Sequence, residues 1–169
     1  MAKAMLICGK ICSGKTWHAK HLMEASAAVL LSIDEILIAL FGTQESENLD
    51  LNVKNIKEYL YKKSIEITES GIDVILDWGF GSHEERQIAT TFYEKNNIAF
   101  EWYYIDASDD VLWDNLSKRN HEIEENRLAF FHFDRERAIY HWNAFQIPAK
   151  EEIDFWVGKH LNTAVTKPR

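Results

Sequence analysis

Short apolar runs alternate with longer amphipathic segments along the chain. The apolar runs that predict buried strands are residues 3–8, 29–33, 73–77 and 100–105. The segments that predict helices are residues 15–25, 34–40, 53–70, 82–96, 109–119 and 135–145. Residues 153–157 fit either a fifth strand or a helical turn. Alternation of this kind is typical of a parallel sheet with helices on both faces, so we expect a three-layer α/β fold.

Polar residues and glycines mark the boundaries of these elements. Asn52 fits the N-cap of the 53–70 helix, Gly71 ends that helix, and Ser82 fits the N-cap of the next. Residues 121–134 are polar and irregular, and we expect a small lid at about residues 120–136. No repeat, low-complexity tract or linker interrupts the pattern, so we expect a single domain over residues 1–169.

One motif joins the first predicted strand to the first predicted helix. Residues 9–16 read GKICSGKT and match the phosphate-binding pattern G-x-x-x-x-G-K-[ST] in its required strand–loop–helix context. The glycines let backbone N–H groups approach phosphate oxygens, and the helix adds the positive end of its dipole. We therefore expect a nucleoside triphosphate here. The residues expected to contact it are Gly9, Lys10, Ile11, Cys12, Ser13, Gly14, Lys15, Thr16, Trp17 and Arg119.

Two aspartates follow buried strands of the predicted sheet. Asp34 comes after the second strand, where ligands of open parallel sheets bind, and can accept the proton of a substrate hydroxyl. The alternative for Asp34 is an N-cap, because a helical pattern begins at once. Asp77 ends the apolar run of the third strand, as a Walker B acid does. We expect Asp77 and the hydroxyl of Thr16 to hold Mg²⁺, which favours carboxylate and phosphate oxygens.

Cationic side chains are needed to neutralise charge during phosphoryl transfer. Lys15 can reach the β- and γ-phosphates, and Arg119 and Arg127 lie before and inside the predicted lid. We expect these three residues, with Asp34, to be catalytic. Arg86 and Arg135 are further candidates, and the alternative for each arginine is a solvated charge on a helix face.

Aromatic residues are frequent beside these positions. Trp78 and Phe80 directly follow Asp77, where stacking on substrate and packing in the core are both reasonable interpretations. The run Trp102 to Tyr104 lies on the fourth predicted strand and is expected to be core.

Composition and charge limit the class of protein. The chain has 169 residues, 46% hydrophobic and 27% charged, as in ordinary globular proteins, and no apolar stretch long enough to span a bilayer. Because the first strand begins so close to residue 1, we expect no signal peptide and a cytoplasmic location. Cys8 and Cys12 are expected to be reduced thiols. The net charge of −8 argues against an extended nucleic-acid surface, although acidity can also serve solubility alone.

Taken together, GKICSGKT, LSIDEI, VILDWGFGSHEER and YYIDASDDVLWDNLSKRN resemble the AAA-type predicted P-loop kinases. This group is related to zeta toxins, chloramphenicol phosphotransferase and the polynucleotide 5′-hydroxyl kinases. The resemblance covers roughly residues 3–120 and implies a nucleoside-kinase-like P-loop fold with ATP- and Mg²⁺-dependent transfer to a hydroxyl. It also implies that Asp34 activates the acceptor and that Arg119 is the lid arginine. Many relatives carry an arginine three residues after the activating acid, and here that position is Leu37.

The sequence therefore favours an ATP-dependent kinase for a small-molecule hydroxyl acceptor. That acceptor is expected near Asp34, Asp77 and Trp78, between the helix at 34–40 and segment 43–70. Two other functions remain open: a nucleotide-binding ATPase or switch without such an acceptor, and a polynucleotide 5′-hydroxyl kinase, which the charge and Leu37 disfavour. Neither the identity of the acceptor nor the oligomeric state can be read from these patterns.

Overall fold

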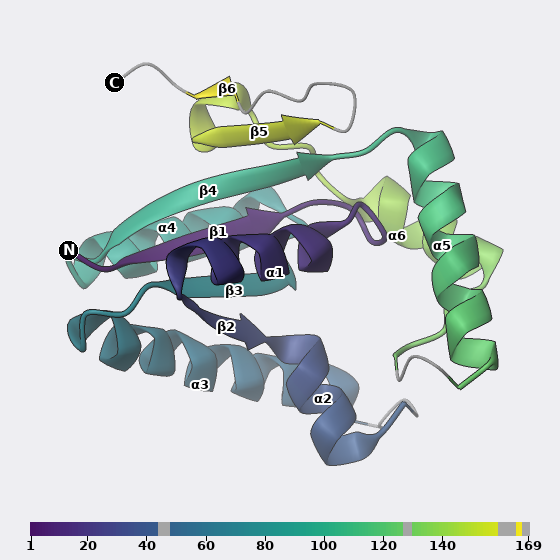
Figure 1. The fold of residues 1–169 in the computed structure, drawn as a ribbon, viewed down its shortest axis with the longest axis horizontal. Coiled ribbons are helices and arrows are strands. Elements are labelled where there is room, and N and C mark those ends of the chain that lie inside the picture. Colours follow the sequence, from purple (N-terminus) through teal and green to yellow (C-terminus); the bar gives the residue numbers. More distant parts are fainter. Residues whose placement is uncertain (44–47, 127–129, 159–164, 167–169) are drawn as a thin grey trace.

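A six-stranded sheet forms the centre of the molecule (Figure 1), as seen in a computed structural model that describes residues 1–43, 48–126, 130–158 and 165–166. The strands are β1 (Lys3–Cys8), β2 (Val29–Ser32), β3 (Val74–Gly79), β4 (Ala99–Asp106), β5 (Phe155–Gly158) and β6 (Val165–Thr166). Their spatial order is β2-β3-β1-β4-β5-β6. The first five run parallel, whereas β6 pairs with β5 in the antiparallel direction. The three-layer α/β fold is confirmed, and residues 155–158 form a strand rather than a helical turn.

Helices connect the parallel strands and cover the sheet. They are α1 (Lys15–Ser26), α2 (Ile33–Phe41), α3 (Leu49–Glu69), α4 (His83–Lys95), α5 (Asp109–Glu124) and α6 (Arg135–Ala144), followed by a 3₁₀ turn at Lys150–Glu152. Along β1 the side chains alternate between the two faces of the sheet, as strand geometry requires. Leu6 packs into the core formed with α3 and α4, whereas Met5 and Ile7 pack into the core formed with α1. Both faces of β1 are therefore buried.

The helices α5 and α6 stand apart from these two layers, beyond the carboxyl ends of the strands (Figure 1). They share a third, smaller core made by Leu112, Leu116, Phe133, Ala138 and Trp142. Residues of the phosphate-binding motif, Ile11 and Cys12, pack against this core. The same elements that flank the predicted lid thus contact the loop between β1 and α1.

Several predicted boundaries are wrong. The helix expected over 109–119 continues to Glu124, so the irregular part of the predicted lid is shorter than residues 120–136. The helix expected from residue 53 already begins at Leu49, with Asn48 rather than Asn52 in the N-cap position. The cap predicted at Ser82 is confirmed, because its side chain accepts a hydrogen bond from the backbone N–H of Glu85. Among the described helices, none combines the length and apolar character needed to cross a membrane.

Candidate functional site

The loop at residues 9–14 turns the chain from β1 into α1 at the carboxyl end of the sheet. Gly9 has φ of +156°, and a Cβ atom there would lie 2.8 Å from the carbonyl oxygen of Ile105. Gly14 occupies the N-cap position of α1 with φ of +101°, a region that glycine adopts without steric cost. The sequence thus places glycine where the backbone turns most sharply, and the N-terminus of α1 points into the loop.

Lys15 lies inside this loop rather than in solvent. Its Nζ donates hydrogen bonds to the carbonyl oxygens of Gly9, at 3.0 Å, and Lys10, at 2.8 Å. Burial lowers the pKa of Lys15, while the nearby carboxylates of Asp77 and Asp34 act in the opposite direction. The ammonium group is thereby held at the first residues of the loop, near one acid from β3 and another from α2.

Thr16 and Asp77 meet directly. The Thr16 hydroxyl donates to Oδ2 of Asp77 at 2.7 Å, joining the start of α1 to β3. Asp77 is buried, and its strand places it in register with Ser32 at the end of β2. No group of three or more His, Cys, Asp or Glu in the described part of the chain has a metal-holding arrangement. A hydroxyl and one carboxylate nevertheless fit Mg²⁺, which takes its other ligands from water and phosphate.

Asp34 is not the N-cap of α2. The side chain of Ser32 occupies that role and accepts from the backbone N–H of Glu35 at 3.4 Å, so Asp34 lies in the first turn of the helix. Burial and, after it, the charge of Asp77 raise the pKa of the Asp34 carboxyl, whereas Lys15 and Arg119 lower it. The capping alternative is therefore excluded, and Asp34 is a partly buried acid near enough to Lys15 and Arg119 for both cations to lower its pKa.

Arg119 reaches the loop from α5. Its guanidinium donates to the carbonyl oxygen of Phe131 at 2.6 Å and to Sγ of Cys12 at 3.8 Å, and it lies 4.1 Å from the centre of the Phe130 ring. Burial lowers its pKa. Its Nε is buried and has no hydrogen-bond partner among the described residues. Arg119 therefore lies between the loop and residues 130–131, with a buried Nε–H group that has no partner among the described residues.

The structure does not bring the other described candidate residues to the loop in the way the sequence predicts. Arg127 lies outside the described residues. Arg135 stacks on the ring of Trp113 at 4.5 Å, and Arg86 is buried against Glu152, the Phe80 carbonyl and the Gln146 carbonyl. Trp17 projects outward with 65% of its surface exposed and its ring 3.8 Å from that of His21. Cys8 is buried at the end of β1, whereas Cys12 is half-buried in the loop, and both are free thiols.

A cavity of about 380 Å³ opens against the first residues of the loop. The side chains that give it chemical character are Lys15, Trp78, Glu85, His141 and Phe145. Asp34 and Asp77 do not line it, so this space differs from the region expected for the acceptor. For Trp78 and Phe80 the sequence left open stacking on a substrate or packing in the core. Phe80 is buried in the core, whereas Trp78 borders the cavity. His141 and Phe145 were not among the candidate site residues predicted from the sequence. They reach the cavity only because α6 packs back against the loop.

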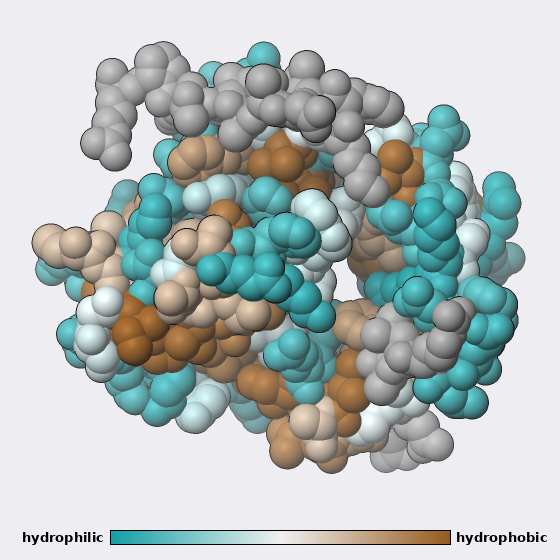
Figure 2. Space-filling view, viewed as in Figure 1, coloured by the Kyte–Doolittle hydropathy of each residue, from teal (hydrophilic) through white to brown (hydrophobic). Residues whose placement is uncertain are grey.

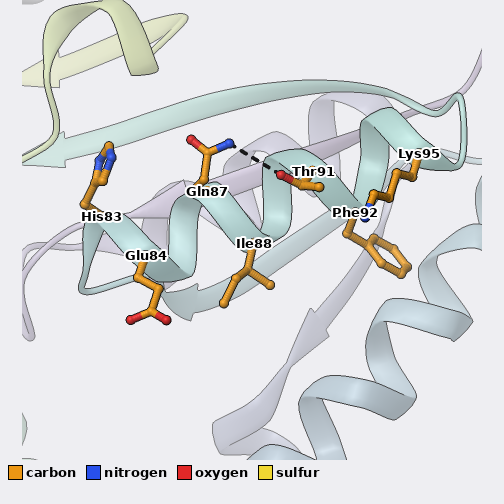
Figure 3. Close-up of a pocket in the computed structure, with 7 residues that line it drawn as sticks. All are labelled: His83, Glu84, Gln87, Ile88, Thr91, Phe92 and Lys95. Atoms are coloured by element: carbon orange, nitrogen blue, oxygen red, sulfur yellow. Dashed lines mark hydrogen bonds between the residues drawn. The ribbon is translucent and has the colours of Figure 1, made fainter.

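A larger hollow, of about 630 Å³, runs along α4 (Figure 3). All seven residues that line it belong to that helix, and the figure shows Ile88 and Phe92 among polar side chains of α4. None of the residues expected to bind nucleotide or metal lies there. On the face shown in Figure 2, by contrast, a hollow separates the mostly hydrophilic surface of α5 from the body of the molecule. The loop and its charged neighbours, not α4, form the candidate active site.

Comparison with known proteins agrees with this geometry. A family model described as an AAA domain matches residues 5–139, whereas no curated protein matches the chain. A presumed kinase from Chloroflexus aurantiacus has TM-score 0.71 and 18% identity, covering 93% of this chain and 86% of its own. The APS kinase CysC of Mycobacterium tuberculosis, in complex with AMPPNP and APS, has TM-score 0.62 and 16% identity, covering 95% and 90%.

A third similar structure is a chain of the Pnkp1/Rnl/Hen1 RNA repair complex, with TM-score 0.69 and 17% identity. The match covers 85% of this chain and 43% of that one. At these identities the likeness establishes a common fold, and the structures share the P-loop kinase architecture. Since the family model spans most of its length, the chain belongs to this AAA-domain family.

Proposed function

We propose that this protein is an ATP-dependent kinase that transfers the γ-phosphoryl group to a hydroxyl of a small-molecule acceptor. One observation carries the proposal: Lys15, Asp77 and Arg119 come from α1, β3 and α5, yet each forms a hydrogen bond to a residue of the phosphate-binding motif. Asp34 of α2 lies close enough for Lys15 and Arg119 to lower the pKa of its carboxyl. An acid, an ammonium and a guanidinium beside such a loop are what phosphoryl transfer to a hydroxyl requires.

In this mechanism the loop N–H groups and Lys15 hold the β- and γ-phosphates. Asp34 accepts the proton of the acceptor hydroxyl as its oxygen forms a bond to the γ-phosphorus. The bond between that phosphorus and the β–γ bridging oxygen breaks, and ADP leaves with the electron pair. Lys15 and Arg119 neutralise charge on the transferring oxygens. Thr16 and Asp77 would hold Mg²⁺, which supplies charge neutralisation when bound.

The raised pKa of Asp34 suits this role. A stronger base takes the hydroxyl proton more readily, provided that it is ionised at the working pH. The two neighbouring cations keep the carboxylate form accessible by opposing the effect of burial. The Asp34 carboxylate is not used to cap α2, because the side chain of Ser32 has that role.

A cavity beside the loop offers space for a small ligand, although Asp34 does not line it. Lys15, the residue expected at the β- and γ-phosphates, also lines the 380 Å³ cavity. Trp78 and Phe145 offer aromatic surface there, and Glu85 and His141 offer polar atoms. A small molecule with hydroxyl groups fits such a mixture of apolar and polar lining.

The polynucleotide 5′-hydroxyl kinase alternative is favoured by one observation, the fold shared with the RNA repair complex. Against it, Leu37 replaces the arginine that many relatives carry, and its side chain is buried in the core beside Ile33 rather than turned to a phosphate. The net charge of −8 argues in the same direction. Oligonucleotide binding that weakens steeply with salt would favour this alternative, and a flat salt response would count against it.

An Asp34→Asn variant tests the proposal together with γ-labelled ATP and a panel of nucleosides, sugars, aminoglycosides and short oligonucleotides. We expect transfer to one of the first three classes by the wild type. The variant should bind ATP as before, while transfer falls at least about a hundredfold. Unchanged transfer would show that Asp34 is not the base. Hydrolysis of ATP by the wild type, without transfer to any acceptor, would favour the ATPase alternative.

A further inference from the structure

Two consecutive carbonyl groups of the phosphate-binding loop are held by side chains from outside it. Trp142 of α6 donates from its indole Nε1 to the carbonyl oxygen of Ile11 at 2.9 Å. Asn115 of α5 donates from Nδ2 to the carbonyl oxygen of Cys12 at 2.8 Å. These bonds join residues that are 131 and 103 positions apart in the sequence. The two carbonyls belong to the peptide units on either side of Cys12.

Cys12 is the residue of the loop whose backbone most needs such support. Its φ of +64° lies in the left-handed region, which a residue with a Cβ adopts only at a steric cost. The surrounding structure must therefore determine this conformation. Hydrogen bonds to both flanking peptide units do so directly, because they fix the direction of each carbonyl.

The direction of the Ile11 carbonyl decides what the loop presents to a ligand. The peptide unit after Cys12 is fixed at both ends, because its N–H group, on Ser13, donates to the Lys10 carbonyl at 3.1 Å. In a trans peptide unit the C=O and N–H bonds point to opposite sides. Because Trp142 draws the Ile11 carbonyl toward α6, the N–H of Cys12 points away from α6 and into the loop. Inward N–H groups are what make a loop of this kind bind phosphate. A reversed peptide unit would place a carbonyl oxygen against the anion instead.

The two donors belong to helices that share one small core. Trp142 is buried, and its ring meets that of Trp113 edge-on at 4.6 Å between centroids. On the other side of the lid, Asn120 exchanges two hydrogen bonds with the backbone of Phe133. The core shared by α5 and α6 therefore joins the two ends of the predicted lid, and Ile11 and Cys12 of the loop pack against it.

We propose that Trp142 and Asn115 are positioning residues that keep the phosphate-binding loop in its anion-receiving conformation. The proposal rests on the proposed function, because it assumes that the loop binds a nucleotide. Trp142 and Asn115 act through the direction of the peptide units beside Cys12, and so they link the helices that flank the lid to the phosphate site.

The test measures the affinity of wild type and variants for two ligands by calorimetry. One ligand is a nonhydrolysable ATP analogue with Mg²⁺, and the other is inorganic tripolyphosphate, which meets the loop alone. Trp142→Phe keeps an aromatic ring but loses the donor. We expect it to weaken binding of both ligands about fivefold, the factor for one ordinary hydrogen bond. Asn115→Ala should do the same.

The matched control is Trp102→Phe, which also removes the donor of a buried indole, here one that donates to Oγ1 of Thr90 at 3.1 Å rather than to the loop. It should alter both affinities less than about twofold, because it does not contact the loop carbonyls. Wild-type affinity in both Trp142→Phe and Asn115→Ala would overturn the positioning role, as would an equal loss in Trp102→Phe. A wild-type protein that binds neither ligand would instead refute the proposed function on which this inference rests.

Discussion

Replacing Arg86 with methionine should cost folding stability rather than catalysis. The guanidinium is only 2% exposed and donates to Oε2 of Glu152 at 2.9 Å, to the Phe80 carbonyl at 3.1 Å and to the Gln146 carbonyl at 3.0 Å. Removing one partner of a buried ion pair typically costs about 3–5 kcal/mol, because the other is left uncompensated. Glu152 retains 24% exposure and can reach water. We therefore expect about 3 kcal/mol, at the lower end of that range.

The assay is urea unfolding at pH 7, followed by circular dichroism. A loss of about 3 kcal/mol is a large share of the roughly 5–15 kcal/mol that stabilises a typical domain. The control is Lys118→Met, since Lys118 pairs with Asp114 at 2.7 Å on the surface, where the side chains are 69% and 61% exposed. That variant should lose less than about 1 kcal/mol.

The pH dependence gives a second check on the same pair. Burial alone would raise the pKa of Glu152, but the backbone N–H of Ala149 and the Arg86 guanidinium outweigh it and hold the pKa below 4.5. The stabilisation by the carboxylate is therefore complete above pH 4.5 and is lost as the pH falls through the folded pKa. The gap between wild type and Arg86→Met should narrow in acid. A fully stable Arg86→Met protein that no longer transfers phosphate would refute the structural assignment.

Two further substitutions test the loop and the acid beside it. Gly9→Ala should abolish ATP-analogue binding in calorimetry, since the new Cβ would lie 2.8 Å from the Ile105 carbonyl; normal affinity would show that the loop can move aside. Asp34→Asn should raise the melting temperature at pH 7, because an acid whose folded pKa is raised, mainly by burial and then by Asp77, destabilises the fold wherever it is ionised. The gain should vanish at a pH low enough to protonate Asp34 in both states, and a lower melting temperature at pH 7 would contradict the raised pKa.

The parts of the fold that could be predicted are those that depend on a residue and its near neighbours in the sequence. The apolar run of β1 predicts a buried strand, and the glycines at positions 9 and 14 predict a tight turn directly after it. Asp77 was predictable as a metal ligand candidate because it ends an apolar strand beside the loop, and the structure places it 2.7 Å from the Thr16 hydroxyl. Each of these inferences needed only the residue and its neighbours in sequence.

The failures share a different cause. The sequence suggested only Asp34 as an N-cap, whereas in the structure α2 begins at Ile33 and Ser32 caps it. From the sequence, Arg86 fits a solvated charge on a helix. Its burial depends on Gln146 and Glu152, which lie 60 and 66 positions further along the chain. Trp142 offered one usable signal, because a buried indole N–H almost always needs an acceptor, but the sequence does not name that acceptor.

This division bears on where acceptor specificity resides. The family model ends at residue 139, and it includes the loop, Asp34, Asp77 and Arg119. Within the cavity beside the loop, however, one wall is formed by His141, Ala144 and Phe145, which lie beyond the matched region. Because α6 also contributes the Trp142 bond to the loop, a single helix contacts both the phosphate-binding backbone and this cavity. Under the proposed function, changes in α6 would therefore alter which small molecule binds beside the loop while Asp34, Lys15 and Arg119 stay the same.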